Sequence, residues 1–415
     1  MTDTIDTIGY FWLADNPDNK VAGRLLFYPK QARLDILESL ESIQPGNIPV
    51  GTISEDKVRI EGKTQMGDLI LADCQRQVFF SECYRVGSII RGISSESSTQ
   101  NPLLSFDYMD IELDLLSDWV GSIDTTITTE TNQGFSVNYQ PHVLAEHQFD
   151  WGEVSLLIHY MIHYLSSQPV TSHHRLIVKL NEPRGLNDLR KLKSAAQRLL
   201  TLATNRPCLI EEAKVGIGRG EGTWMEHTLG DNLVDTDRAR SPLPLFSYTD
   251  IGGIEGIAKW FDLYLMYGRA INSLTSSVYI DVLYAENRYT NSVAAIESIA
   301  VRDDSSLISD HSVKRRVKHI ANQLAGTIFD DLVDNQIETW ANKAVDIRNE
   351  WAAHGSDNDR IDYQMVSAFG ESVYYLGVIW LLTECGMPQS VFDKIQERGV
   401  FDSLKRRLRP HLENG

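Results

Sequence analysis

The sequence predicts a multidomain α+β protein, in which a β-rich, sandwich-like or barrel-like region comes first and an all-α helical bundle follows. Between Gly9 and Val178, short apolar segments are separated by Gly, Pro, Asn and Asp, a spacing typical of antiparallel strands. After Gly253 the apolar residues recur with a helical period almost to the C-terminus. The length of 415 residues suits two or three domains. We place the β-rich region at residues 1–275 and the helical domain at residues 276–415.

Within the β-rich region, the hydrophobic period changes once from strand to helix. One amphipathic helix is expected around residues 186–202, where apolar residues share one helical face. A strand-like piece follows at residues 208–215. Residues 216–241 are polar and rich in Gly and Asp, which predicts a long exposed loop. The expected strands include residues 23–28, 57–60, 68–71 and 108–113, and Tyr10, Phe11 and Trp12 are expected in the core of this region.

The second half is expected to be helical throughout. Its apolar residues follow a helical period in each segment, and the chain has no internal repeat and no low-complexity tract. The expected helices are at residues 257–274, 284–299, 313–332, 336–353, 361–383 and 388–398.

The net charge of −18 excludes a protein that coats nucleic acid or an anionic membrane with its whole surface. Residues 1–284 hold 24 basic and 37 acidic side chains, a balance of −13, whereas residues 285–415 hold 15 and 20, a balance of −5. Clustered cations on an acidic body suit a confined anionic ligand better than a long duplex. Each cluster either contacts RNA or is an ordinary solvated face. The clusters are Lys314, Arg315, Arg316 and Lys318, then Lys405, Arg406, Arg407 and Arg409.

Several features predict a cytoplasmic protein with no membrane partner. The N-terminus is acidic where a signal peptide would be basic, and no apolar segment follows it. The longest apolar run, residues 373–382, is too short to span a bilayer. The four cysteines include no CxxC pair, so neither a disulfide framework nor a thiolate zinc site is expected.

Residues 336–355 contain the candidate site. Apolar residues from Ile337 to Trp351 recur at spacings of three, four, three and four, which predicts a seam that packs against other helices. His354 occupies the next seam position, and Gly355 is a plausible helix stop. An arginine, Arg348, precedes the histidine by six positions. The sequence therefore places a cation and a titratable group near the end of one core helix.

Spacing alone leaves two interpretations of this pair open, a satisfied core histidine or a functional site. A second pair, Arg406 and His411, has a similar spacing in the polar C-terminal segment, where Pro410 is expected to break any helix. An Arg/His spacing is therefore weak evidence by itself.

Residues 347–355 (IRNEWAAHG) resemble the RNxxx(x)H signature of HEPN ribonucleases, and residues 294–299 (AAIESI) resemble the first-helix motif of that family. Residues 9–15 (GYFWLAD), 21–27 (VAGRLLF) and 71–74 (LADC) resemble the N-terminal domain of ApeA proteins. Those proteins are bacterial anti-phage factors that join such a domain to a HEPN ribonuclease. The resemblance implies an endoribonuclease that acts by abortive infection.

The resemblance implies catalytic roles for Arg348 and His354, with Asn349 orienting the phosphate or the histidine, or remaining an ordinary solvated residue. RNA carries its own nucleophile, the 2′-hydroxyl, so cleavage needs no metal and no cofactor if a base deprotonates it. Histidine titrates near neutrality, and arginine offers a permanently charged fork to phosphate oxygens. The implied product is a 2′,3′-cyclic phosphate, and tRNA is the favoured substrate. Lys314, Arg315, Arg316 and Lys318 are the candidate RNA-binding residues.

A geometric difficulty predicts an oligomer. In an ideal helix, six residues leave Arg348 and His354 about 120° apart around the axis. They converge if the helix bends or ends there, or if two chains contribute. HEPN ribonucleases build a composite cleft across a dimer, so we expect at least a homodimer, to which the apolar seam could contribute. A phage protein is a possible trigger.

Other motifs are weaker. Residues 216–222 contain four glycines but lack a following helix, which argues against a phosphate loop. His159 and His163 stand four apart, as zinc ligands on a helix do, yet their neighbours indicate core packing. His173 and His174 are expected in an exposed linker without a role.

The rival interpretation is a non-catalytic sensor or scaffold, whose HEPN-like half only dimerises or binds a nucleotide. It predicts that RNA stays intact under all conditions.

Overall fold

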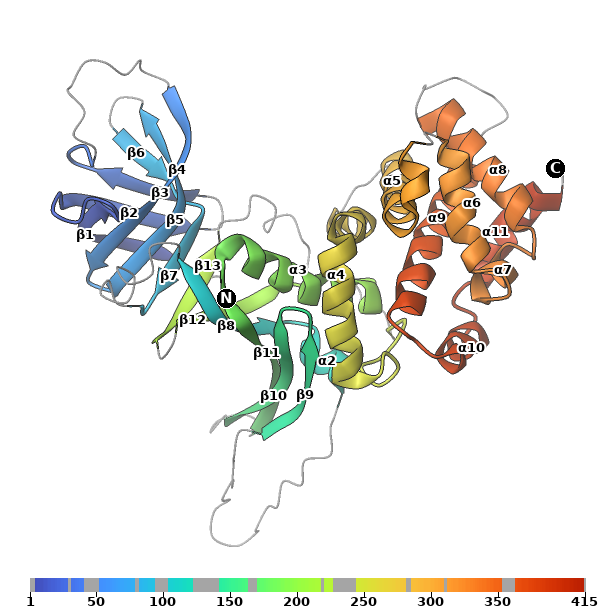
Figure 1. The fold of residues 1–415 in the computed structure, drawn as a ribbon, viewed down its shortest axis with the longest axis horizontal. Helices are drawn as coiled ribbons and strands as arrows, with labels where there is room; N and C mark the ends of the chain where they lie inside the picture. Colours follow the sequence, from blue (N-terminus) through green and yellow to red (C-terminus); the bar gives the residue numbers. More distant parts are fainter. Residues whose placement is uncertain are drawn as a thin grey trace, which may run out of the picture.

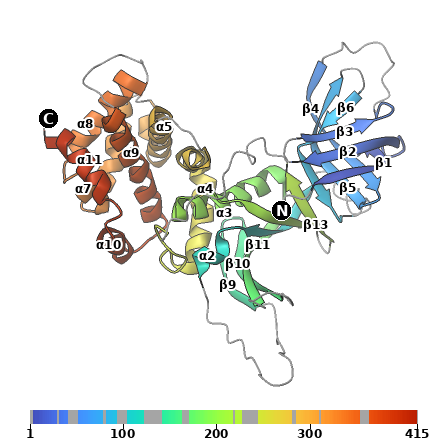
Figure 2. The same ribbon diagram turned by 180° about the vertical axis from the view of Figure 1, so that it is seen from behind.

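We analysed a computed structural model of the chain. It describes residues 4–28, 31–40, 52–78, 82–93, 104–121, 142–162, 170–217, 220–226, 244–280, 285–309, 312–352 and 363–413. A β-barrel and a helical bundle lie at opposite ends of the molecule, and an open sheet with two long helices lies between them (Figures 1 and 2). The α+β architecture expected from the sequence is therefore confirmed.

The first six strands close into an antiparallel barrel. Strand order runs β4-β1-β2-β3-β6-β5, and β4 also pairs with β5, which completes the ring. Inward side chains alternate with outward ones. Phe11 and Trp12 are buried in this region as expected, but Tyr10 is 60% exposed because it points to the outer face of its strand. The strands are β1 (Ile5–Leu13), β2 (Val21–Tyr28), β3 (Gln31–Ile36), β4 (Thr52–Thr64), β5 (Gly67–Val78) and β6 (Glu82–Arg85).

The other seven strands continue from the barrel as an open antiparallel sheet. The half of β5 that does not pair with β6 pairs with β7, and the order then runs β7-β13-β12-β8-β11-β10-β9. Asp73, with φ of +54°, lies where β5 passes from one partner to the other. Its carboxylate accepts a hydrogen bond from Arg190 of helix α3 (Leu186–Thr204). The strands are β7 (Ser88–Arg91), β8 (Ser105–Leu113), β9 (His142–Phe149), β10 (Gly152–Ile162), β11 (Val170–Gly185), β12 (Ile210–Ile217) and β13 (Gly220–Glu226).

One face of the open sheet holds a buried charge network. Arg175 of β11 donates from Nε to Asp110 (2.6 Å) and from Nη1 to Glu212 (2.8 Å) and Glu112. The side chains of Arg175 and Asp110 are only 8% and 7% exposed. Burial raises the pKa of Asp110, although the guanidinium of Arg175 opposes this shift. The arginine therefore holds together carboxylates from two further strands.

Helices α2 (Leu116–Val120), α3 (Leu186–Thr204) and α4 (Gly253–Ser276) pack on the opposite face of this sheet. Helix α3 confirms the amphipathic helix expected at residues 186–202. Trp260 of α4 is completely buried and donates its indole N–H to the carbonyl of Ala195 in α3 (2.8 Å). The open sheet and α3 therefore share a core with α4.

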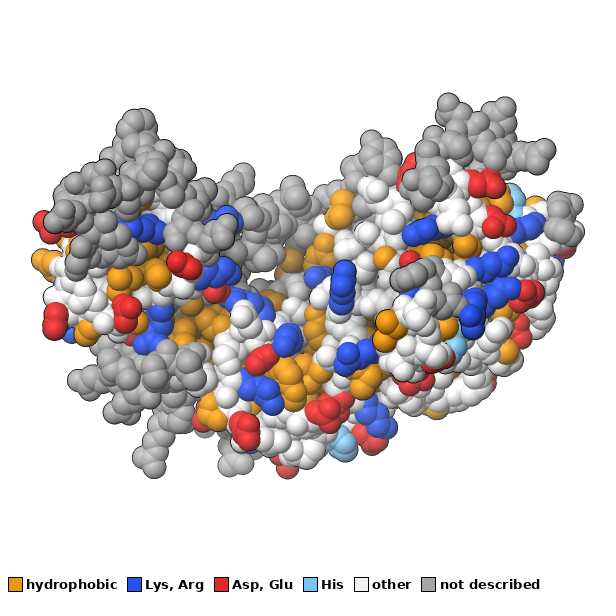
Figure 3. Space-filling model, turned by 45° about the horizontal axis from the view of Figure 1, so that its top comes forward, with side chains coloured by type: hydrophobic (Ala, Val, Ile, Leu, Met, Phe, Trp, Pro, Cys, Tyr) orange, Lys and Arg blue, Asp and Glu red, His pale blue; other side chains and the backbone are white. Residues whose placement is uncertain are grey.

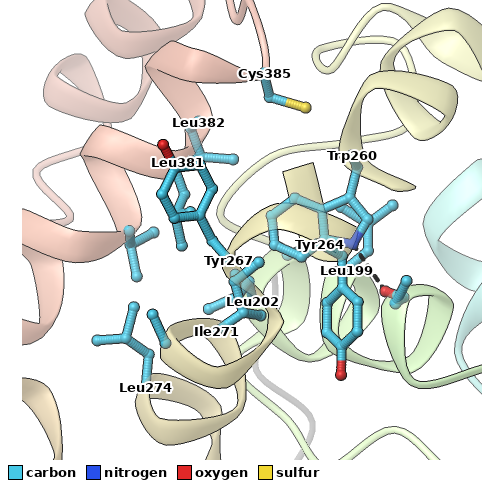
Figure 4. Packing of buried hydrophobic residues seen from close by; sticks show 14 of the residues in the cluster. Leu199, Leu202, Trp260, Tyr264, Tyr267, Ile271, Leu274, Leu381, Leu382 and Cys385 are labelled. Atoms are coloured by element: carbon cyan, nitrogen blue, oxygen red, sulfur yellow. Dashed lines mark hydrogen bonds between the residues drawn. The ribbon is translucent and has the colours of Figure 1, made fainter. Parts of the chain in front are cut away.

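Helix α4 also packs against the helical bundle. It bends at Tyr267, whose backbone leaves helical geometry (φ −116°, ψ 15°), and the Tyr267 ring stacks edge-on with Trp380 at 5.3 Å. Figure 4 shows Trp260 and Tyr264 on the side of α3, and Tyr267 near Leu381 of the bundle. These residues belong to one continuous hydrophobic cluster. The buried core thus runs from the open sheet into the bundle through one shared helix.

The bundle surrounds α9 (Tyr363–Glu384). This helix is long and apolar enough to cross a membrane, but 78% of its apolar stretch is buried inside the protein, as in a core helix. The segment expected at residues 313–332 is two helices, because Gly326 adopts φ of +76° between them. The helices are α5 (Ala285–Asp303), α6 (Val313–Gln323), α7 (Ile328–Leu332), α8 (Ile337–Ile347), α9, α10 (Gln389–Glu397) and α11 (Asp402–Glu413), with short 3-10 turns η2 (Ser277–Tyr279) and η3 (Ser305–Ile308).

Helix α11 corrects the expectation that Pro410 prevents a helix. The helix continues through Pro410 to Glu413, and Leu404, Leu408 and Leu412 are buried on one face. Proline in a helix interior costs about 3 kcal/mol, but packing of an amphipathic face provides most helix stability in proteins. The segment is therefore a packed part of the bundle rather than a polar tail.

Candidate active site

Helix α8 positions the candidate site through its buried face. Ile337, Trp340, Ala344 and Ile347 are each at most 9% exposed, which confirms the seam predicted from their spacing. Trp340 donates its indole N–H to Ser372 of α9 (2.9 Å) and packs edge-on against Phe329. Because the chain's own bundle buries this seam, it is not available as a dimer interface.

The helix changes geometry at Arg348. Residues Arg348–Ala352 form a π-helical turn, η4. The Arg348 backbone N–H is shared between the carbonyls of Ala344 and Val345. π-turns inside α-helices are frequent at functional sites. The 120° separation expected for an ideal helix therefore does not apply beyond this residue.

Two of the three candidate catalytic residues lie on this turn. Arg348 is half-buried, and its Nη1 donates to Oδ1 of the exposed Asn349 (3.1 Å). The guanidinium thus lies at the boundary between core and solvent, where an anion can reach it. His354 lies outside the described residues.

A buried tyrosine of α5 contacts the end of α8, and the sequence analysis did not single it out. Tyr289 is 0% exposed and donates its hydroxyl to the Ala344 carbonyl. Burial raises the pKa of Tyr289, although the nearby Arg348 charge opposes this. The one available sequence signal was its place in the helix that also contains residues 294–299.

In the motif at residues 294–299, Glu297 forms an ion pair with Arg316 (3.3 Å).

The candidate RNA-binding residues on α6 differ in their surroundings. Arg316 also donates to the Leu307 carbonyl (3.0 Å), and Lys318 pairs with Glu338. That lysine lowers the pKa of Glu338, with a smaller contribution from Lys314. Arg315 is exposed. Two members of the cluster are therefore committed to contacts within the bundle.

This cluster does not lie at the π-turn η4. Lys318 contacts Glu338 in the first turn of α8, whereas Arg348 follows the last turn. Ten residues of helix separate the two positions, a rise of about 15 Å. An RNA bound at both would have to extend along α8.

The second basic cluster, on α11, is also paired with acidic residues. Lys405 lies 2.7 Å from Asp331, Arg409 lies 3.1 Å from Asp334, and Arg407 pairs with Glu371. Although burial opposes it, Arg409 and Lys405 lower the pKa of Asp334. Figure 3 likewise shows basic side chains of the helical half lying among acidic ones.

The described histidines of the motifs in the first half lie on strands. His159 belongs to β10, so its spacing to His163, which is outside the described residues, is not a helical one. The expectation of an exposed linker for His173 and His174 is wrong. Both belong to β11, and His174 is 3% exposed, because alternate residues of this strand face the core. Burial, reinforced by His173, lowers the pKa of His174.

The glycine-rich segment 216–222 belongs to a hairpin. Gly216 pairs with Glu221, and Ile217 with Gly220, between β12 and β13. The long loop expected at 216–241 is therefore wrong for residues 216–217 and 220–226, whereas residues 218–219 and 227–241 lie outside the described residues. Across the described parts of the chain, no group of three or more His, Cys, Asp or Glu side chains is arranged to hold a metal ion.

The fold and the site together define a protein in which a barrel-and-sheet region is joined to a helical domain with an Arg-Asn motif at the end of a core helix. A family model described as ApeA N-terminal domain 1 matches residues 6–260, and one described as Apea-like HEPN matches residues 265–391. The first match alone covers more than half of the chain, so the chain belongs to the ApeA family. HEPN domains are generally ribonucleases, and this domain pair is associated with anti-phage defence. No curated protein and no solved structure matches the chain significantly.

The two family models meet inside α4. The first ends at residue 260 and the second begins at residue 265, two residues before the bend at Tyr267. The division that we placed at residues 275/276 corresponds to the C-terminal end of the same helix.

Proposed function

We propose that the protein is a metal-independent endoribonuclease of the HEPN type that acts in the cytoplasm in anti-phage defence by abortive infection. The observation that carries this proposal is the position of Arg348-Asn349 on a π-turn at the end of a core helix, within a matched HEPN domain and six residues before His354. We propose tRNA or another structured RNA as the substrate.

The proposed chemistry needs only two side chains. A base removes the proton of the 2′-hydroxyl, whose oxygen attacks the adjacent phosphorus while the bond to the 5′-oxygen breaks. That leaving oxygen takes up a proton, and the product is a 2′,3′-cyclic phosphate. His354 moves the protons, because imidazole titrates near neutral pH. Arg348 stabilises the charge that develops on the phosphate oxygens, and Asn349 holds its guanidinium.

We propose that the N-terminal region holds this activity at a low but measurable basal rate, which a phage protein raises. The support is the continuous core through α4, in which Trp260 contacts α3 and Tyr267 contacts α9. A conformational change in the open sheet can therefore reach the bundle through the packed side chains of α4. Coupling of this kind requires two arrangements of the shared element, and the bend in α4 is where they would differ.

We also propose that the active protein is at least a homodimer with a composite cleft. Since the α8 seam is buried in the chain's own bundle, another surface must form the interface. Lys314, Arg315, Arg316 and Lys318 remain the candidates for RNA contact. Of these, Arg316 and Lys318 would have to exchange Glu297 and Glu338 for phosphate.

Removal of metal tests the proposed chemistry. Purified full-length protein incubated with total tRNA is expected to give the same cleavage rate with excess EDTA as with Mg²⁺, because neither Arg348 nor His354 acts through a metal ion in the proposed mechanism. The new ends are expected to carry 2′,3′-cyclic phosphates, detectable because a phosphatase removes the phosphate only after the cyclic phosphate has been opened with acid. Cleavage that requires added metal, or ends with a free 3′-hydroxyl, would contradict the mechanism. RNA that stays intact under all conditions would favour the alternative, a non-catalytic sensor or scaffold. The ion pairs between both basic clusters and acidic residues are consistent with that alternative.

A further inference from the structure

Tyr289 of α5 forms a hydrogen bond with the backbone of the helical turn that precedes Arg348. Among the described residues, it is the one side chain of another helix that does so. In a regular α-helix, the carbonyl of residue 344 accepts only from the N–H of residue 348. Here it also accepts the Tyr289 hydroxyl, and the Arg348 N–H is divided between two carbonyls. Helices depart from regular geometry at π-turns and where a side chain inserts into this ladder of hydrogen bonds.

The position of the Tyr289 hydroxyl is itself fixed by burial. The side chain is 0% exposed, and a buried phenol hydroxyl needs a hydrogen-bond partner. Behind it lies Gly370 of α9, where an added Cβ would come within 3.2 Å of the Tyr289 Cβ. The absence of a side chain at Gly370 therefore lets α5 approach α9 closely enough for Tyr289 to reach α8.

We infer that Tyr289 is a positioning residue for the proposed ribonuclease site. Its hydroxyl bonds the Ala344 carbonyl, which also accepts from the Arg348 N–H where the π-turn begins, and the π-turn sets where the guanidinium points. The residue acts through the backbone of α8 and does not touch the substrate. This inference rests on the proposed function for its effect on cleavage, but its effect on the turn is independent of it.

The test compares Tyr289→Phe with Tyr374→Phe in the full-length protein. Tyr374 is 2% exposed and belongs to α9, so the control removes a hydroxyl from an equally buried tyrosine of the same domain. Misplacement of a catalytic group by about 1 Å can cost up to 100-fold in rate. We expect Tyr289→Phe to lower kcat for RNA cleavage about 10- to 100-fold. Because only contacts made in the transition state are lost, KM of Tyr289→Phe should stay within about threefold of the wild-type value. For Tyr374→Phe, both kcat and KM should stay near the wild-type values.

Hydrogen exchange provides a readout that does not depend on activity. Removing a bond between α5 and α8 lowers the cost of local opening, so the amides of residues 344–352 should exchange at least about threefold faster in Tyr289→Phe only. A wild-type kcat in Tyr289→Phe would overturn the inference while leaving the proposed function intact. If the wild-type protein does not cleave RNA, the proposed function fails, and the hydrogen-exchange rates alone test whether Tyr289 positions the turn. Unchanged exchange of residues 344–352 in Tyr289→Phe would then overturn the inference.

Gly370→Ala is the second variant, for the case in which Tyr289→Phe does not fold. It retains the hydroxyl and adds a good helix former, but pushes on the Tyr289 Cβ. We expect a lower kcat, and a wild-type value would overturn the inference.

Discussion

Replacement of Arg348 by alanine is expected to slow RNA cleavage about 100- to 1,000-fold, the usual cost of removing one group that stabilises the developing charge. The half-buried Arg348 guanidinium has one described side-chain contact, Oδ1 of Asn349. Its removal therefore leaves no buried charge without a partner, and the free energy of unfolding should change little. The rate of tRNA cleavage and a urea unfolding curve, measured on the same preparation, separate the two effects.

Arg348→Lys should recover only part of the lost rate. Lysine keeps the positive charge but cannot offer the planar, two-pronged contact that arginine makes with phosphate oxygens. Arg406→Ala is the matched control, because Arg406 is exposed on α11, where its Nε donates to the Asp402 carbonyl (3.4 Å). If Arg348→Ala cleaves as fast as both Arg406→Ala and the wild-type protein, Arg348 has no role in the reaction.

The largest effect on stability is expected at Arg175. Arg175→Met leaves Asp110, Glu112 and Glu212 close together on the sheet without their shared cation. Breaking a buried ion pair by removing one partner costs about 3–5 kcal/mol. The loss should appear as a lower midpoint in urea unfolding.

An exposed pair on the barrel provides the control for this prediction. Arg24 contacts Asp6 through two hydrogen bonds of 2.8 and 2.7 Å, but these side chains are 55% and 42% exposed. Water screens exposed ion pairs and leaves them little net stabilising effect, so Arg24→Met should lower the midpoint far less than Arg175→Met. Equal losses in the two variants would mean that the Arg175 network does not stabilise the sheet through its buried charges.

Local patterns in the sequence predicted much of the fold. The seam of α8 could be predicted because spacings of three and four place its residues on one helical face, and packing buries that face. The ring closure of the barrel could not, because it depends on β4 pairing with both β1 and β5. No periodicity within a strand specifies such pairings.

The sequence predicted that the candidate motif follows a core helix, but it did not predict the geometry of the turn there. The apolar spacing continues through Trp351 without interruption, so nothing local indicates that the helix leaves α geometry at Arg348. The contact that accompanies this change comes from Tyr289, 55 positions before Ala344. The partners of the basic cluster, Glu297 and Glu338, likewise come from other helices. A run of cations in a sequence therefore does not reveal which of them are already paired.

The central claim, that the motif at the end of α8 cleaves RNA without metal, is tested most directly by His354→Ala against His411→Ala. His411 belongs to the similarly spaced pair on α11, where its ring lies 6.4 Å from that of Phe369. The measurement is the single-turnover rate of tRNA cleavage in EDTA. Loss of a general acid–base group predicts a rate about 100- to 10,000-fold lower for His354→Ala, and a wild-type rate for His411→Ala. Equal cleavage by His354→Ala and the wild-type protein would contradict the account.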